Sequence, residues 1–137
     1  VIIVATSAII VVGTSGHYQD NETRISFPSA SMLTTLNDAL RQNQAAYHNG
    51  VIWSTDAIYR ETSEKVKYFQ RQDAIGVEME ISALFTVAKF RGVDLAAMAV
   101  VSDELSSFKW RPGFKMDEFK HGRKKACTVI KDLCRKL

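Results

Sequence analysis

Glu78-Met79-Glu80 is the first place where residue types and spacing could support chemistry. Its two acids lie two positions apart, at the start of a helix that the pattern predicts over 78–91. Residues two apart cannot share one helix face, so one carboxylate can point into a cleft while the other anchors the chain locally. Acids at a helix start are also common because they favour the helix dipole. The pattern alone therefore favours a capping role over a binding role.

Ser102-Asp103 is the second candidate, because it directly follows the apolar run 94–101. That run predicts a strand buried on both faces. In parallel sheets ligands bind beyond the carboxyl ends of strands, and Asp56 and Asp103 both fall at such predicted ends. Burial there would favour the protonated acid and suit Asp103 to general acid catalysis. The alternative is a cap or turn residue before Glu104-Leu105, and both interpretations stay open.

A basic and aromatic tail is the third candidate. Residues 109–137 hold ten Lys+Arg against three Asp+Glu, whereas residues 1–108 hold eight against twelve. A basic patch with interleaved aromatics could bind nucleic acid, but such a run is more often the solvated face of a terminal helix. The net charge of +3 is too small to argue for a nucleic-acid partner, and we expect none.

Other classes of function find little support. The three histidines are scattered without ligand-like spacing, so we expect no metal site. Cys127 and Cys134 are too few for a disulfide scaffold and fit a reducing cytoplasm. They lie seven apart, which places both on the core stripe of the predicted last helix as packing residues. No apolar run reaches the ~18 residues of a membrane helix, so we expect no membrane partner.

Hydrophobic residues make up 46% of the 137 residues, which predicts a packed core in one domain or part of one. Periodicity predicts strands at 1–12 (or two strands with a break at Thr6-Ser7), 24–27, 48–55, 74–77 and 94–101. It predicts helices at 29–45, 61–72, 78–91 and 117–137, the last of them weakened by Gly122. This alternation predicts an α/β fold with a mixed, largely parallel sheet flanked by helices.

Four segments together resemble the nucleoside phosphorylase family, which contains uridine phosphorylases, hexameric-type purine nucleoside phosphorylases and adenosylhomocysteine nucleosidases. They are residues 13–18 (GTSGHY), 50–59 (GVIWSTDAIY), 76–85 (GVEMEISALF) and 100–103 (VVSD). They occur in the family's order and at its spacing. The resemblance covers residues 1–137 but only the C-terminal portion of a family domain, so the phosphate-binding residues would lie in an N-terminal half that precedes Val1.

The resemblance implies phosphate-dependent cleavage of the N-glycosidic bond of a nucleoside, giving free base and ribose 1-phosphate. Glu80 would hold the ribose 2′- and 3′-hydroxyls, Met79 would pack against the sugar, and Glu78 would help from the same turn. A carboxylate that accepts two hydroxyl protons fixes the sugar and positions C1′ for attack.

At the other end of the substrate, the resemblance assigns the base to a second set of residues. The acid at Asp103 would protonate or hydrogen-bond a purine ring nitrogen and so neutralise the leaving group as its charge develops. Ser102 would orient that acid, and Ile58 and Tyr59 would flank the base.

The identity of the base is the point where the signals conflict. The surroundings of residues 14–18 and 53–56 look more like uridine phosphorylases, but the Gln-x-Arg uracil clamp of enterobacterial members is replaced by Thr62 and Glu64. Ser102-Asp103 looks purine-like. We therefore expect purine nucleosides slightly ahead of uridine, with a hydrolytic nucleosidase third and a non-enzymatic nucleoside-binding remnant as a further alternative.

The remaining expectations also come from the resemblance. They are a cytoplasmic transferase of nucleoside salvage that uses inorganic phosphate as co-substrate and needs no cofactor. The chain would work as a homo-oligomer, a dimer or a hexamer, in which a neighbour completes the site.

Overall fold

The computed structural model describes residues 1–20 and 22–136. Its strands are β1 (Ile2–Val11), β2 (Ile25–Ser26), β3 (Tyr47–Thr55), β4 (Ala74–Glu78), β5 (Met98–Val100), β6 (Asp103–Glu104) and β7 (Arg111–Pro112). Its helices are α1 (Ala30–Gln42), α2 (Ser63–Gln70), α3 (Ile81–Arg91) and α4 (Asp117–Cys134), with short 3-10 turns η1 (Thr14–His17) and η2 (Ile58–Arg60). None of the described helices combines the length and apolar character that crossing a bilayer requires.

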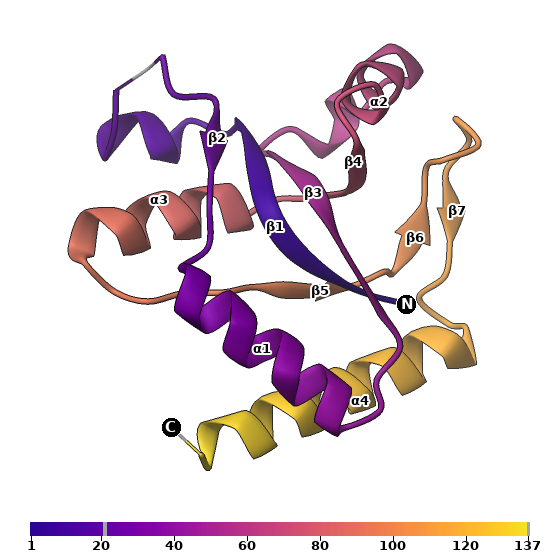
Figure 1. Ribbon diagram of the computed structural model, residues 1–137. Coiled ribbons are helices and arrows are strands. Elements are labelled where there is room, and N and C mark those ends of the chain that lie inside the picture. Colours follow the sequence, from indigo (N-terminus) through magenta and orange to yellow (C-terminus); the bar gives the residue numbers. More distant parts are fainter. Residues whose placement is uncertain (21, 137) are drawn as a thin grey trace.

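The central sheet is mixed and mostly parallel, which confirms the predicted fold class (Figure 1). β3 pairs with β1 in parallel, and β4 pairs with β3 in parallel. On the other edge of β1, β2 and β5 both pair antiparallel, β2 near Ala8 and β5 near Ile3. β1 is one strand, and the predicted break at Thr6-Ser7 is a register shift against β3 between Ala5 and Ser7.

Helices cover both faces of this sheet, because alternate residues of β1 point to opposite sides. α1 and α4 lie side by side on one face (Figure 1). There they form one buried cluster with the sheet: Ile2, Val4, Leu36, Ala39, Leu40, Ala126, Val129 and Leu133. α3 covers the opposite face, where Ile81 and Phe85 pack on Ile3, Ala5, Ala8 and Ile52. Next to this cluster, the ring of Trp53 in β3 stacks on the ring of Phe69 in the last turn of α2, and the two ring centroids are 4.3 Å apart.

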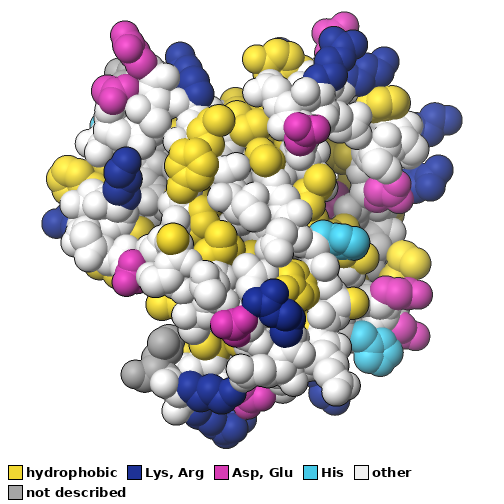
Figure 2. All heavy atoms as spheres, in the orientation of Figure 1, with side chains coloured by type: hydrophobic (Ala, Val, Ile, Leu, Met, Phe, Trp, Pro, Cys, Tyr) yellow, Lys and Arg dark blue, Asp and Glu magenta, His cyan; other side chains and the backbone are white. Residues whose placement is uncertain are grey.

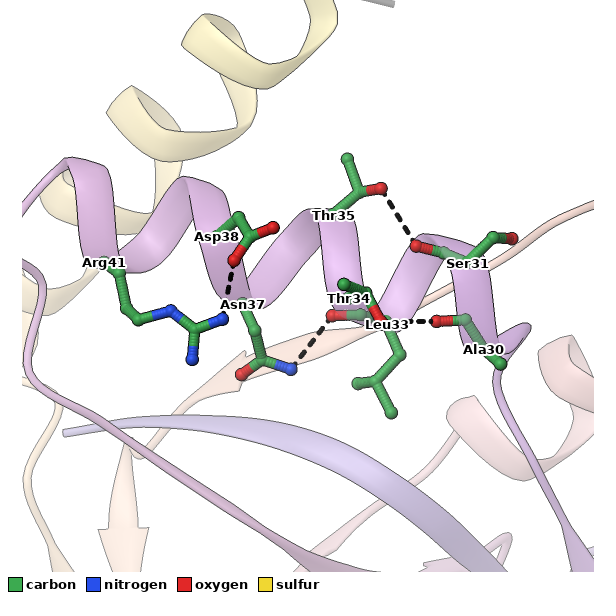
Figure 3. Close-up of polar contacts among 8 residues, drawn as sticks. All are labelled: Ala30, Ser31, Leu33, Thr34, Thr35, Asn37, Asp38 and Arg41. Carbon is green, nitrogen blue, oxygen red and sulfur yellow. Dashed lines mark hydrogen bonds and ion pairs between the residues drawn. The ribbon is translucent and has the colours of Figure 1, made fainter.

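Several polar side chains of α1 form hydrogen bonds within the helix itself. Thr34 and Thr35 donate their hydroxyl hydrogens, and Asn37 its amide hydrogen, to the carbonyl oxygens four residues earlier at 2.9–3.0 Å (Figure 3). Asp38 and Arg41 form an ion pair of 2.6 Å one turn apart. This local pairing leaves the opposite face of α1 apolar for contact with the sheet.

Cys127 and Cys134 are exposed, so the prediction that they pack in the core is wrong. The buried face of α4 is instead the stripe Ala126, Val129 and Leu133. The close approach of Gly122 to β5 explains this choice of face. A Cβ at Gly122 would lie 2.9 Å from Cγ1 of Val100, which is too close for any residue with a side chain. α4 therefore turns its glycine towards β5, and the residues one turn further along the same face are the ones that become buried.

The strand predicted over 94–101 is wrong in both length and direction. Only Met98–Val100 form β5, its residues are half-buried, and it runs antiparallel to β1. The end of β5 therefore lies beside the start of β1, and the direction of its strand does not bring Asp103 to the edge where β1, β3 and β4 end. An apolar run predicts burial but carries no information on strand direction, which is why this inference failed.

Candidate functional site

The junction between β4 and α3 holds the Glu78-Met79-Glu80 motif. Glu78 is the last residue of β4, and α3 begins only at Ile81, three residues later than predicted. Oε2 of Glu78 accepts the backbone N–H of Glu80 and of Ile81, both at 2.6 Å. The carboxylate thus satisfies amides at the positive end of the helix, as the capping interpretation predicts.

Ser54 fixes the second oxygen of Glu78. The Ser54 hydroxyl donates to Oε1 of Glu78 and accepts the backbone N–H of Ser82 at 2.9 Å. Ser54 is fully buried at the end of β3, so it joins the ends of two neighbouring strands to the first turn of α3. Apart from its place in segment 50–59, nothing in the sequence pattern indicates that Ser54 anchors Glu78.

Glu80 and Met79 differ from Glu78, because both are exposed. Within residues 1–20 and 22–136, no hydrogen bond or ion pair engages the Glu80 carboxylate. The two acids of the motif therefore differ because of the turn between β4 and α3 and not because of a shared helix: Glu78 anchors the turn, and Glu80 is free to accept hydrogen bonds from a ligand.

The end of β3 adds a second set of predicted residues. Asp56 accepts the backbone N–H of Gly13 at 3.1 Å, which ties the segment after β3 to the segment after β1. In the following turn η2, Ile58 is 53% exposed and Tyr59 is 97% exposed. Figure 2 shows apolar side chains exposed between β2 and α2 on the visible face. Apolar surface of this kind can receive a flat ring or be covered by further protein.

Asp103 is half-buried and lies on the β6–β7 hairpin. The Ser102 hydroxyl donates to its Oδ1 at 2.5 Å, and the indole Nε1–H of Trp110 donates to its Oδ2 at 2.8 Å. The predicted partner Ser102 is thus in contact with Asp103. Trp110 was missed as a site residue, because the sequence places it seven positions away within the aromatic tail.

The hairpin reaches the segment between β3 and α2. Burial raises the pKa of the Glu61 carboxyl above its ordinary value, and the negative charge of Asp103 raises this pKa further, while Lys65 opposes both. The Lys67 ammonium lies 4.9 Å from the centroid of the Phe108 ring. Figure 1 shows β6 and β7 rising beside β4 and α2. Asp103 is therefore close to the connection that starts at the end of β3, despite the direction of β5.

Two surface clefts lie elsewhere. One of about 600 Å³ lies between the start of β1 and α4 and is lined by residues such as His121 and Lys124. The other, of about 730 Å³, lies between the β2–α1 connection and the second half of α3. Neither is lined by Glu80 or Asp103. The predicted site residues thus lie on three open connections rather than inside either cleft.

The chain resembles known proteins over nearly all of its length. The family model described as the phosphorylase superfamily matches residues 1–135. A guanosine phosphorylase of Halorubrum lacusprofundi is 33% identical over 103 residues, which are 75% of this chain and 42% of that protein.

Two solved structures are similar in fold. A uridine phosphorylase from Vibrio fischeri, 26% identical, matches 98% of this chain and 56% of its own with a TM-score of 0.75. A purine nucleoside phosphorylase from Toxoplasma gondii, 13% identical, matches 97% of this chain and 54% of its own with a TM-score of 0.85. The chain spans about half the length of these proteins, and it belongs to the phosphorylase superfamily.

Proposed function

We propose that the protein containing this chain is a nucleoside phosphorylase that prefers purine nucleosides to uridine. The observation that carries the proposal is the division of the acidic motif, in which Glu78 is bound by Ser54 and two backbone amides while Glu80 is exposed and unengaged among the described residues. A rigid turn that presents one free carboxylate is the arrangement needed to hold two neighbouring hydroxyls of a sugar.

In the proposed reaction, Glu80 accepts the ribose 2′- and 3′-hydroxyl protons and Met79 packs on the sugar. A phosphate oxygen forms a bond to C1′ as the bond from C1′ to the base nitrogen breaks. The bonding electrons leave with the base, so the transition state gains positive charge on the ribose and negative charge on the base. Holding the ribose still lowers the barrier, because the reacting atoms are already aligned.

Asp103 is proposed to neutralise the leaving base by giving its proton to a purine ring nitrogen. Ser102 holds this acid, and the exposed Ile58 and Tyr59 are the proposed flank of the base. The proximity of the hairpin to the β3–α2 connection supports this assignment, because it brings Asp103 to the segment that carries Ile58 and Tyr59.

The N-terminus of α2 supports the proposed preference for purine nucleosides over uridine. Thr62 is the N-cap of α2, and its hydroxyl accepts the backbone N–H of Lys65 at 3.4 Å. Glu64 lies in the first turn of the same helix, where an acid favours the helix dipole. The two positions that would carry a uracil clamp are thus an acid and a helix cap, neither of which offers the amide and guanidinium donors of that clamp.

The whole protein is further proposed to obtain its phosphate-binding groups from segments outside these 137 residues and to act as a homo-oligomer. The open placement of Glu80 and Asp103 supports this, because glycosidic cleavage by phosphate rather than water needs an enclosed site.

The test is base release by the protein with its natural flanking sequence, from guanosine, inosine and uridine, with and without phosphate. We expect release only with phosphate and faster release from the purine nucleosides. Equal release without phosphate would make the protein a hydrolytic nucleosidase, and faster cleavage of uridine would reverse the assigned preference. Binding without cleavage under either condition would leave only a nucleoside-binding role.

A further inference from the structure

The two oxygens of Asp103 are held by two chemically different donors. The hydroxyl of Ser102, the preceding residue, donates to Oδ1. The indole N–H of Trp110, which directly precedes β7, donates to Oδ2 at 2.8 Å. Asp103 pairs with Pro112 across the hairpin, so the backbone register itself brings the indole to the carboxyl group. A single donor would leave the carboxyl group free to rotate, whereas donors on both oxygens fix its plane.

The chemistry of these two donors is not equivalent. An indole N–H can only donate, so the oxygen that faces Trp110 must accept. A serine hydroxyl can donate or accept, so the oxygen beside Ser102 can carry a proton without losing its partner. The neutral form of Asp103 therefore keeps the stronger bond from Trp110 when the proton lies on Oδ1, because the carbonyl oxygen of a carboxylic acid is a better acceptor than its hydroxyl oxygen.

We propose that Trp110 is a positioning residue that orients Asp103 and confines its acidic proton to the oxygen beside Ser102. The inference rests on the proposed function, in which that proton goes to the leaving purine. Trp110 itself need not touch the substrate. It acts by keeping one oxygen occupied as an acceptor, so that the proton-bearing oxygen has a single fixed direction.

Trp110→Phe removes the N–H donor and keeps an aromatic ring at a position that is 60% exposed. We expect guanosine phosphorolysis to lose roughly tenfold in kcat, the size that one hydrogen bond to a charged group can account for, with KM nearly unchanged. A purine nucleoside methylated at the ring nitrogen N7 already carries a positive base and leaves without a proton. The kcat of Trp110→Phe for this methylated nucleoside should stay within about twofold of the wild-type value, because its cleavage does not depend on a proton from Asp103.

Arg111→Gln is the matched control on the neighbouring residue. Its ion pair with Glu104 is 4.0 Å long and exposed, and it has no bond to Asp103. This variant should leave the rates of both nucleosides unchanged, because exposed ion pairs contribute little.

The experiment compares guanosine with 7-methylguanosine, in saturating phosphate, for wild type, Asp103→Asn, Trp110→Phe and Arg111→Gln in the protein with its natural flanking sequence. If wild type cleaves neither nucleoside, the proposed function fails. If Asp103→Asn slows guanosine alone but Trp110→Phe slows neither, or both equally, then only the role of Trp110 fails. The indole N–H resonance of Trp110 gives a second readout independent of activity. It should move in Asp103→Asn, and an unmoved resonance would overturn the contact on which the inference depends.

Discussion

Ser54→Ala tests the anchor beneath the acidic motif. Ser54 is 0% exposed, and its hydroxyl links Glu78 to the backbone N–H of Ser82. Removing the hydroxyl leaves this buried N–H without an acceptor, which costs about 1–3 kcal/mol. It also removes the bond to the Glu78 carboxylate, which contributes roughly 1 kcal/mol because that group is only half-buried.

Ser54→Ala should therefore lower the free energy of unfolding by about 2–4 kcal/mol, which for a domain of this size is a fall of roughly 8–16 °C in Tm. Equilibrium unfolding in urea, followed by the fluorescence of the buried Trp53, measures this loss. Ser31→Ala is the matched control, since Ser31 is exposed on α1 and should change stability by less than about 0.5 kcal/mol. A Ser54→Ala protein as stable as the control would refute the view that the motif is anchored by this serine.

Two further predictions concern packing and pH. Gly122→Val should destabilise the protein by about 1–3 kcal/mol in the same urea assay, because its side chain would push α4 away from Val100; an unchanged midpoint would mean that this contact is absent. Glu61 has a folded pKa above its ordinary value of 4.5, so the folded state binds the proton more tightly than the unfolded state. The unfavourable contribution of Glu61 to stability is absent well below pH 4.5, grows as the pH rises from there to the raised pKa, and is constant above it. Glu61→Gln should therefore be more stable than wild type at neutral pH and should flatten the loss of stability above pH 4.5. Identical pH–stability curves would contradict the burial of the Glu61 carboxyl and its closeness to Asp103.

The parts of the fold that the sequence predicts well are those with strong periodicity. β1, β3 and α1 lie within a few residues of their expected bounds, because long apolar runs mark the two strands and a serine precedes the periodic apolar residues of the helix. Ser29 does occupy the N-cap position of α1, but its hydroxyl accepts the backbone N–H of Leu95 at 2.8 Å and makes no capping bond to the helix. The apolar face of α4 was predicted one residue off, since Cys127 and Ala126 fit a helical stripe equally well. Only the close approach of Gly122 to β5 decides between them.

The sequence likewise indicated only part of the candidate site, because the rest depends on contacts between distant segments. Glu78 ends β4 and Glu80 is the N-cap of α3, so this turn, and not helix geometry, sets the different environments of the two acids. The spacing of the two acids allowed for one anchoring and one free carboxylate. It could not indicate that Ser54, from another strand, completes the anchor, or that Trp110 folds back onto Asp103. Both contacts depend on strand pairing and hairpin register, and these are set by the whole fold rather than by local pattern.

The free carboxylate of Glu80 is the most direct point of test, and the measurement is kcat/KM for guanosine in Glu80→Gln. Two hydrogen bonds from sugar hydroxyls to a charged group contribute about 1.5–3 kcal/mol each, so we expect a loss of roughly 10²–10⁴-fold. Because Glu80 is exposed, the free energy of unfolding should stay within about 0.5 kcal/mol of wild type. A variant that folds normally and cleaves guanosine within about threefold of wild type would contradict the assignment of Glu80 as the residue that holds the ribose.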